Sequence, residues 1–359
     1  MLTDLAHTYP EEDKRGKFLL DLGRYLQTLS EDDIVFATHA HCTDGMVAAS
    51  MIRYAFPHAK IVPIGYWFLN DPLASSLKKI KYTGIIDLAP FNELPTEFWV
   101  DHHLSAMNNR INAKKIRFDV DGDSGSYQLL LSGFLPELPD YLIELAVLTR
   151  ITDTASYTIL PPYEPEESFT ELLQYPFSYI DDLSKVELQI QRKAYLLDDA
   201  VATSFDFWEW QNLVNEFASS GFNAISNRLD KIKEIRDGRK VAFNMVKEMP
   251  ISDFVAFIVP DEKYDVFAIR RYLLAKGPKA VVSLTEGHNG YRISLRRAKN
   301  LSPEFSSKIQ LNQLAEQLNG GGHAAASGGF SKDLEYAIDT MRNWAEEKGL
   351  KFIQIDLRG

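Results

Sequence analysis

The sequence predicts an α/β protein with two domains, the first built on a doubly wound, mostly parallel sheet. Three observations lead to this prediction. Short apolar runs alternate with helical segments between residues 33 and 153, as they do where helices connect parallel strands. A second series of strand signals begins near residue 239, after a stretch of helical periodicity. The length of 359 residues and the hydrophobic content of 45% are sufficient for two cores.

Five short runs in the first half are predicted as strands because they are apolar and rich in branched or aromatic residues. They are 34–38 (IVFAT), 60–66 (KIVPIGY), 84–89 (GIIDLA), 98–101 (FWVD) and 115–120 (KIRFDV). Segments 45–56 and 124–135 have helical periodicity. In doubly wound sheets, ligands bind beyond the carboxyl ends of the strands. The functional site is therefore expected at the residues that follow these strands.

The character of the chain changes after residue 153. A loop rich in Pro and Glu at 160–168 leads into two helical stretches, 184–204 and 221–238. Strand signals return at 239–246, 252–260, 280–286 and 290–297, and a Gly-rich loop precedes a helix over 333–349. We therefore predict a first domain over 1–190, a helical connector over 191–238 and a smaller α/β domain over 239–359.

Charge and cysteine content limit the class of protein. The chain has 39 basic and 50 acidic residues, a net charge of −11, which opposes general affinity for long nucleic acid. Its one cysteine, Cys42, excludes an intramolecular disulfide. The sequence shows neither the apolar run of a signal peptide nor a stretch of about 18 apolar residues that would span a membrane. These features predict a cytoplasmic protein without a membrane partner.

Acidic and imidazole side chains gather where the strands of the first domain are expected to end. They lie in the segment His39-Ala40-His41-Cys42-Thr43-Asp44-Gly45, at Asp87, in the triplet Asp101-His102-His103, and at Asp153 in ITDT. Carboxylates and imidazoles together are ligands for Mn²⁺, Mg²⁺ or Zn²⁺, and carboxylates held close together repel one another unless cations neutralise them. The pattern predicts a divalent metal site.

Simpler interpretations remain open for some of these residues. Asp153 could cap a helix end, and His41 is interpreted as structural because His39 competes for the ligand role. A spaced series of acids lacks the glutamate at the twelfth position of a calcium loop, so we predict a turn and a helix N-cap there. Its members are Asp119, Asp121 and Asp123.

A glycine-rich segment marks the second domain. Residues 319–329 (NGGGHAAASGG) contain five glycines, whose backbone N–H groups can approach an anion closely. His323 in this segment, and Ser294, Arg296 and Arg297 in the preceding strand, offer hydrogen bonds suited to phosphate. The alternative is a flexible turn beside a solvated basic strand end.

Taken together, these residues resemble the DHH superfamily of metal-dependent phosphoesterases, in the form that carries a DHH-associated C-terminal domain. The resemblance covers both domains. Its motifs are the signature triplet Asp101-His102-His103, the bridging Asp87, the last metal aspartate Asp153, and the substrate loop that contains Gly320, Gly321, Gly322 and His323. The fold implied is a metal-binding catalytic domain followed by a substrate-binding domain.

The resemblance implies a role for each matched residue. One metal ion would be held by Asp44, Asp87, His102 and Asp153, and a second would receive His39 and Asp87. His103 would face the scissile phosphate, with Asp101 as the other catalytic residue. Substrate binding would fall to Ser294, Arg296 and the glycine loop with His323.

Cys42 departs from the pattern of the superfamily. The usual first motif has two aspartates separated by one residue, and Cys42 stands at the first of these positions. If its sulfur binds metal, it favours softer ions such as Zn²⁺, Fe²⁺ or Co²⁺. The alternative is that Cys42 is a small buried residue under the site.

The function implied is hydrolysis of short oligonucleotides, or of cyclic or linear dinucleotides, to mononucleotides by a metal-activated water, as in an exonuclease-like oligoribonuclease. Manganese is the expected ion, with Mg²⁺, Co²⁺ or Zn²⁺ as alternatives. The substrate is expected in the interdomain cleft, and long duplexes are not expected to bind. Two other functions stay open: a pyrophosphate or polyphosphate hydrolase, and a nucleotide-binding module with a degraded first metal site. A cluster of aromatics could line the cleft or a homodimer face, although helix packing also explains it; its members are Phe205, Phe207, Trp208 and Trp210.

Overall fold

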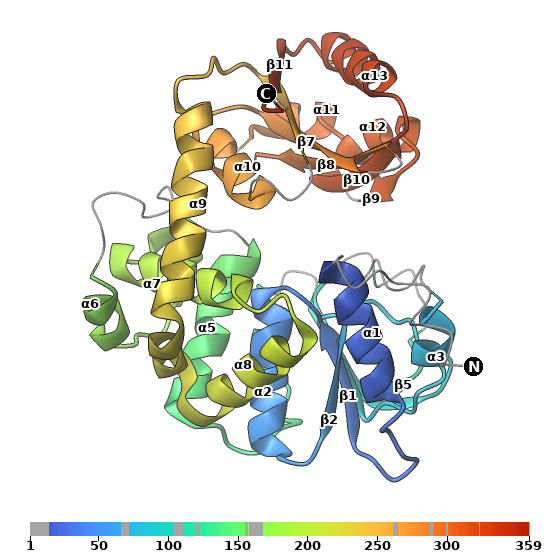
Figure 1. Ribbon diagram of the computed structural model, residues 1–359, viewed down its shortest axis with the longest axis vertical. Coiled ribbons are helices and arrows are strands. Elements are labelled where there is room, and N and C mark those ends of the chain that lie inside the picture. Colours follow the sequence, from blue (N-terminus) through green and yellow to red (C-terminus); the bar gives the residue numbers. More distant parts are fainter. Residues whose placement is uncertain are drawn as a thin grey trace. The chain divides into compact units, whose positions relative to one another are not determined.

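The chain forms two compact units, residues 1–235 and residues 236–359, in the computed structural model (Figure 1). The structure describes residues 14–65, 72–103, 106, 111–119, 123–154, 157, 168–260, 265–287, 290–298, 301–322 and 324–358. Within these residues, every helix is too short or too polar to cross a lipid bilayer. The predicted domain boundaries at 190 and 238 stay a prediction.

The first unit is built on a five-stranded parallel sheet with the strand order β2-β1-β3-β4-β5. The strands are β1 (Val35–His39), β2 (Lys60–Ile64), β3 (Gly84–Ile86), β4 (Thr96–Asp101) and β5 (Ala113–Phe118). Each overlaps one of the runs predicted from the sequence. The predicted parallel sheet is therefore confirmed.

Helices cover both faces of this sheet, because successive strand residues face two different cores. In β1, Phe36 packs in one core, whereas Val35 and Ala37 pack in the other. The first core includes α2 (Thr43–Ala55), α4 (Gly125–Leu131), α5 (Asp140–Thr154), α6 (Phe169–Gln174), α7 (Leu188–Ala202) and α8 (Phe207–Ser220). The second includes α1 (Lys14–Leu26) and α3 (Ala74–Lys78). The sheet is doubly wound, as predicted.

One strand predicted from the sequence is wrong. Residues 239–246 belong to α9 (Leu229–Lys247), which follows the 3₁₀ helix η5 (Gly221–Arg228). The buried positions of this stretch are Arg239, Ala242, Phe243 and Val246. This spacing of three, four and seven residues is that of one helix face, whereas a strand would bury every second residue. Several apolar residues close together in the sequence made this helical segment resemble a strand.

The second unit contains a six-stranded mixed sheet with the order β11-β6-β7-β8-β10-β9. The strands are β6 (Phe254–Val259), β7 (Ala280–Gly287), β8 (Gly290–Arg297), β9 (Gly321–Gly322), β10 (Ala326–Ser331) and β11 (Phe352–Asp356). β11, β6 and β7 are parallel, whereas β8, β10 and β9 pair antiparallel. Most of the segment predicted as a glycine loop therefore forms two strands.

Two helical layers enclose the second sheet. On one face, α9 and α10 (Val266–Ala275) pack against β6 and β7. On the other face, the core receives α12 (Leu311–Gln317) and α13 (Leu334–Glu347), with α11 (Pro303–Lys308) at its border. The predicted smaller α/β domain with a Gly-rich segment is confirmed as a fold.

Candidate metal centre

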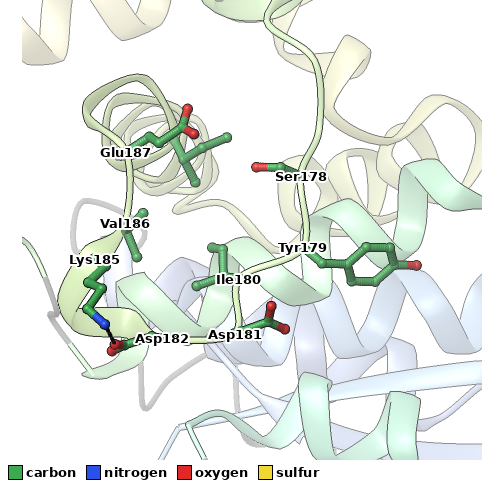
Figure 2. A pocket seen from close by; sticks show the side chains of 9 residues that line it. Ser178, Tyr179, Ile180, Asp181, Asp182, Lys185, Val186 and Glu187 are labelled. Carbon is green, nitrogen blue, oxygen red and sulfur yellow. Dashed lines mark ion pairs between the residues drawn. The ribbon is translucent and has the colours of Figure 1, made fainter.

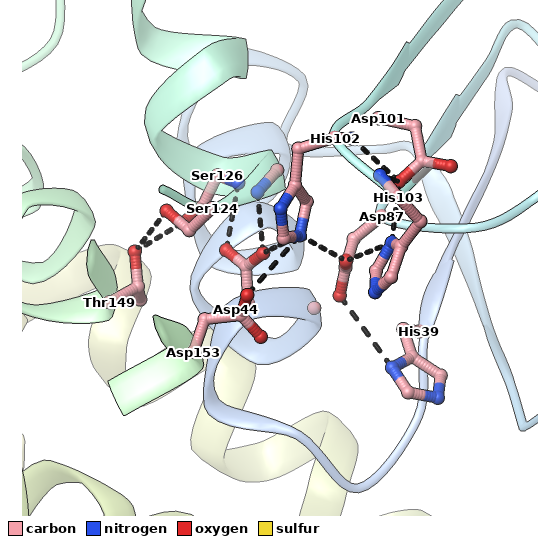
Figure 3. Close-up of polar contacts among 12 residues, drawn as sticks. His39, Asp44, Asp87, Asp101, His102, His103, Ser124, Ser126, Thr149 and Asp153 are labelled. Atoms are coloured by element: carbon pink, nitrogen blue, oxygen red, sulfur yellow. Dashed lines mark hydrogen bonds and ion pairs between the residues drawn. The ribbon is translucent and has the colours of Figure 1, made fainter. Parts of the chain in front are cut away.

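The carboxyl ends of three neighbouring strands carry most of the candidate ligands. β1, β3 and β4 are adjacent and parallel, so their ends lie at one edge of the sheet. His39 is the last residue of β1 and Asp87 directly follows β3. Asp101 ends β4, and His102 and His103 come next. Sheet topology thus brings these five side chains together, as Figure 3 shows.

Two helices add carboxylates to this edge. Asp44 lies in the first turn of α2, and Asp153 lies in the last turn of α5. The carboxylate of Asp44 accepts hydrogen bonds from the backbone N–H groups of Gly125 (2.5 Å) and Ser126 (2.8 Å). These are the first residues of α4, whose N-terminus has a positive partial charge. The position of Asp44 is therefore fixed by another segment of the chain.

Glycine is required where α2 meets the end of β1. A Cβ atom at Gly45 would lie 2.0 Å from the backbone oxygen of His39, a distance that no side chain tolerates. The absence of a side chain at Gly45 lets the first turn of α2 approach the strand. Asp44 is consequently held near the ligands from the sheet.

Asp87 lies at the centre of the cluster. Its Oδ2 is 3.3 Å from the Sγ of Cys42 and 3.6 Å from the Nδ1 of His39. Its Oδ1 is 3.5 Å from the Nε2 of His102 and 3.7 Å from the Nδ1 of His103. The backbone of Asp87 has a φ of +58°, a left-handed conformation that is uncommon outside glycine and that clusters at functional sites.

The Nε2 atom of His102 faces three carboxylates from three elements. It lies 3.3 Å from Asp153, 3.5 Å from Asp87 and 3.7 Å from Asp44. Within the described part of the chain, this buried nitrogen has no hydrogen-bond partner, and neither do Oδ1 of Asp87 and Oδ2 of Asp101. Buried polar atoms left without partners are costly and are rare in proteins. The nitrogen of His102 and Oδ1 of Asp87 lie 3.5 Å apart, which suits a cation with oxygen and nitrogen ligands.

The candidate ligand atoms fall into three groups, in each of which the atoms lie within 4.8 Å of one another. The groups are His39, Cys42 and Asp87; Asp44, His102 and Asp153; and Asp87, Asp101, His102 and His103. Asp87 and His102 connect the groups. His41 takes no part in them, because its ring packs against those of Phe18 and Phe205.

Burial and mutual repulsion shape the charges of the cluster. Burial raises the pKa of Asp44 well above its ordinary value, and Asp87 and Asp153 raise it further. The pKa of Asp153 is also raised, first by burial and then by Asp87. Burial alone would raise the pKa of Asp87, but its close contacts with His102 and His39 hold it well below its usual range. The carboxylates therefore need positive charge to coexist.

The two histidines of the triplet supply part of that charge. Burial opposes the charged form of His102, but its contacts with Asp87 and Asp153 raise its pKa to about 10. The pKa of His103 is raised to about 9, against the effect of burial, mainly by its hydrogen bond to Asp101. At His102, divalent ions would replace the proton as the source of positive charge.

Asp101 fixes the ring of His103. Its Oδ1 accepts hydrogen bonds from the backbone N–H groups of His102 (2.8 Å) and His103 (3.3 Å), and it lies 2.7 Å from the Nδ1 of His103. A buried carboxylate in this position holds the proton on Nδ1 and leaves Nε2 for another partner. Asp101 therefore positions His103.

Cys42 has contacts that support both interpretations of its role. Its Sγ accepts a hydrogen bond from the N–H of Gly45 at 3.1 Å and so caps the N-terminus of α2. The thiol also donates to Asp87, and the Sγ belongs to the group with His39. Burial, followed by the charges of Asp87 and Asp44, raises the pKa of the thiol well above its ordinary value. The protonated thiol is a structural cap, and a bound cation would favour the thiolate.

In the second unit, the structure places Ser294 beside the glycine-rich segment. Ser294 of β8 pairs with Gly328 of β10, and Gly328 pairs with Gly321 of β9. The glycines are needed here, since a Cβ at Gly320 would lie 1.9 Å from the oxygen of Gly328. Gly322 completes β9, whereas His323, predicted to bind substrate, lies outside the described residues.

The two arginines that follow Ser294 differ in role. Arg296 lies on the same side of β8 as Ser294, because the two residues are separated by one. Arg297 instead donates hydrogen bonds to the backbone oxygens of Ser306 (2.6 Å) and Ile309 (3.0 Å). Arg297 therefore stabilises the end of α11, and the phosphate role considered for it is not supported by these contacts.

The helix N-cap predicted in the acid-rich segment is confirmed at the start of α4. Ser124, not an aspartate, is the N-cap of α4, and its hydroxyl accepts the N–H of Tyr127. Asp123 pairs with Arg150 at 2.6 Å. Asp121 lies outside the described residues.

The aromatic residues singled out in the sequence differ in their exposure. Phe207 and Trp210 are fully buried, whereas Phe205 and Trp208 are about half exposed.

A separate pocket of about 150 Å³ lies between α6 and α7 (Figure 2). The pocket is lined by Ser178, Tyr179, Ile180, Asp181, Asp182, Lys185, Val186, Glu187 and Ile190. Lys185 and Asp182 form an ion pair of 3.2 Å in its wall. None of the residues predicted for the site lines it, so the pocket is distinct from the metal-ligand cluster.

Similarity to known proteins is found at the level of structure. No family model matches the sequence, and no curated protein matches it. The pGpG-specific phosphodiesterase PggH from Vibrio cholerae superposes with a TM-score of 0.59 and 15% identity, over 88% of this chain and 99% of that chain. The DHH domain of a member of the s1p family of ribosomal proteins gives 0.55 and 13%, over 96% of both chains. This chain has the DHH fold.

The DHH fold extends over both units. RecJ from Thermus thermophilus, in its complex with Mn²⁺, gives a TM-score of 0.54 and 12% identity over 96% of this chain. This chain spans only 56% of the length of that RecJ chain. At these identities the likeness concerns the fold, so the chemistry has to be argued from the residues of this chain.

Proposed function

We propose that this chain is a metal-dependent phosphodiesterase that hydrolyses short oligonucleotides, or linear or cyclic dinucleotides, to mononucleotides. One observation carries the proposal. At the carboxyl edge of the first sheet, two groups of ligand atoms, one with His39 and Cys42 and the other with Asp44, His102 and Asp153, lie on either side of Asp87. This arrangement suits two ions that share a carboxylate.

The donor set fits divalent cations. Carboxylates and imidazoles accept Mn²⁺, with Mg²⁺, Co²⁺ or Zn²⁺ as alternatives, and two buried atoms without hydrogen-bond partners, Nε2 of His102 and Oδ1 of Asp87, lie 3.5 Å apart. When bound, such ions lower the pKa of a water molecule and bind the negative charge that develops on phosphoryl oxygens. The one thiol, from Cys42, would shift preference toward the softer of these ions.

His103 and Asp101 have a role that does not require ligation. In the charged ring, which the raised pKa of His103 favours, Asp101 accepts the Nδ1 proton and Nε2 is the nitrogen that can donate a hydrogen bond to a phosphoryl oxygen. A charged donor of this kind stabilises the pentacoordinate phosphorus more than the ground state. His103 and Asp101 are therefore proposed as the catalytic residue and its positioning residue.

Three features support a short nucleotide substrate. The net charge of −11 opposes long nucleic acid. The second unit presents Ser294 and Arg296 beside the bare glycine strands, which suits a phosphate of a small ligand. Two proteins with the same fold are described as a pGpG-specific phosphodiesterase and as an exonuclease. The cytoplasm is proposed as the place of action.

The test is mononucleotide release from labelled RNAs and DNAs of two to five nucleotides and from cyclic dinucleotides, with Mn²⁺ and with chelator. We expect turnover of one class with Mn²⁺ and none with chelator. Asp87→Asn should abolish turnover, whereas Asp182→Asn, the same exchange at a carboxylate half exposed in another loop, should leave it unchanged.

Three results would contradict the proposal. Release of orthophosphate from pyrophosphate, without cleavage of any dinucleotide, would favour the pyrophosphatase alternative. Binding of a dinucleotide without turnover, by protein that retains less than one metal ion per chain, would favour a nucleotide-binding module. Turnover that survives exhaustive chelation would exclude the metal role itself.

A further inference from the structure

The second unit contains a buried arginine that was not among the residues predicted for the site. Arg270 lies on α10, and only 4% of its surface is exposed. Its Nη1 donates a hydrogen bond of 2.7 Å to the hydroxyl oxygen of Ser294. Its guanidinium carbon lies 4.7 Å from the ring centre of Phe267, a side chain that is 63% exposed. Both partners are uncharged.

No carboxylate among the described residues forms an ion pair with Arg270. Other buried arginines differ, since Arg228 pairs with Glu216 at 3.0 Å and Arg239 pairs with Asp265. Burial, followed by the charges of Arg296 and Arg271, lowers the pKa of Arg270 to about 9. A buried guanidinium near two further cations is costly unless an anion compensates it.

The surface next to Arg270 is unusually bare. Ser294, Gly328 and Gly321 stand side by side on three adjacent strands, so their side-chain positions share one face of the sheet. A Cβ at Gly321 would meet nothing within 4 Å, and one at Gly328 would meet only a backbone oxygen at 3.5 Å. Ser294 therefore carries the one hydroxyl among these three positions, and Ser283 of β7, its partner on the other side, is buried and donates to the backbone oxygen of Ser294.

The hydrogen bond from Arg270 also determines how Ser294 can bind a ligand. A serine hydroxyl has one proton to donate and lone pairs that accept. Because the oxygen of Ser294 accepts from Arg270, its proton is left to donate outward. Ser294 thereby becomes a donor on a face that already carries Arg296, which lies on the same side of β8. Such a set of donors and positive charges suits an anion.

We propose that Arg270 is a positioning residue for a terminal phosphate: it orients Ser294 as a donor and adds positive charge beneath a phosphomonoester bound by Ser294 and Arg296. This inference rests on the proposed phosphodiesterase function. A terminal phosphomonoester carries about −1.5 to −2 charges at neutral pH, about 1.5 to 2 times that of an internal phosphodiester. More than one guanidinium near the site therefore favours the terminal group over an internal phosphate.

The test compares the affinities of three probes: pGpG, GpGp and the unphosphorylated GpG. Titration calorimetry on the full chain, with chelator to prevent turnover, measures each affinity. We expect the wild type to prefer one phosphorylated probe over GpG by about tenfold or more, as loss of charge-assisted hydrogen bonds implies. Arg270→Met should reduce this preference to about threefold or less without weakening GpG. Arg270→Lys, which keeps the charge but loses the planar fork, should restore part of it.

A control substitution and a stability measurement distinguish the positioning role of Arg270 from a purely structural role. Arg342→Met makes the same change at a half-exposed residue of α13 and should leave all three affinities unchanged. Exchange of an unpaired buried charge for an apolar side chain is often neutral or stabilising, so Arg270→Met should unfold at the same or a higher temperature. With Mn²⁺, it should raise KM for the phosphorylated dinucleotide more than it lowers kcat.

The outcomes distinguish the inference from the function on which it rests. If the wild type cleaves and binds dinucleotides, but Arg270→Met keeps the full preference for the phosphorylated probe, the inference fails and the proposed function stands. An equal loss of affinity for all probes with a lowered unfolding temperature would show a structural role and would also overturn the inference. If the wild type neither binds the probes nor releases mononucleotides, both fail.

Discussion

Two substitutions of Cys42 can distinguish its role as the N-cap of α2 from a role as a metal ligand. Cys42→Ala removes the Sγ that accepts the N–H of Gly45 at 3.1 Å, and no methyl group can replace it. Cys42→Ser keeps an acceptor at nearly the same place, and serine is a preferred N-cap. The pair therefore separates capping of α2 from ligation of metal.

The magnitude follows from the burial of α2. Loss of an N-cap costs about 0.5–2 kcal/mol, and this helix begins with buried residues from Thr43 onward, so water does not fully replace the lost bond. For a unit of this size, 1 kcal/mol corresponds to about 2–4 °C in Tm. We expect Cys42→Ala to lower the Tm of metal-free protein by about 3 °C and Cys42→Ser to lower it by less than about 1 °C.

Thermal unfolding in chelator measures the capping role, and equilibrium dialysis measures ligation. If the sulfur binds metal, both variants lose affinity for Zn²⁺ or Co²⁺ by about tenfold or more, while affinity for Mn²⁺ changes less. Equal Tm values for Cys42→Ala and wild type would refute the capping argument. Unchanged affinity for Zn²⁺ and Co²⁺ in both variants would remove Cys42 from the ligands.

Three further predictions concern the two binding regions. Gly125→Ala places a Cβ 2.9 Å from that of Asp87, so the affinity for metal measured by dialysis should fall about tenfold. The control is Gly238→Ala, where a Cβ meets nothing within 4 Å. This variant should keep the affinity for metal and should stabilise α9 by up to about 1 kcal/mol. Asp101→Ala should lower kcat about a hundredfold in steady-state assays, and equal rates would argue against its positioning of His103. His323→Ala should lower kcat/KM for a dinucleotide with metal content unchanged, and loss of metal would instead make His323 a ligand.

The parallel sheet of the first unit was predictable because each strand is a short apolar run with a clear end. The residues at those ends, such as His39 and Asp87, could be placed at one edge because parallel strands share their direction. The second unit was harder. At 239–246 a helix with a mixed surface resembles a strand in composition, and only the spacing of buried residues separates the two.

Contacts between distant segments were not predictable from spacing. Asp44 and Gly125 are 81 positions apart, and neither residue type indicates that a helix N-terminus will receive the carboxylate. Arg270 gave no signal either, because an arginine within an amphipathic helix is normally taken as exposed. Its burial follows from the approach of α10 to β7, which depends on tertiary packing.

The cluster in the first unit and Arg270 in the second present the same physical problem with opposite signs. Asp44, Asp87 and Asp153 lie within a few ångströms of one imidazole nitrogen, and Arg270 is buried against uncharged partners. Each arrangement disfavours the folded state on its own, because buried charge without compensation is costly. Such arrangements persist where a ligand supplies the missing charge, in the first case cations and in the second an anion. The charges left uncompensated in the first unit thus suit cations, and the one left uncompensated in the second unit suits an anion.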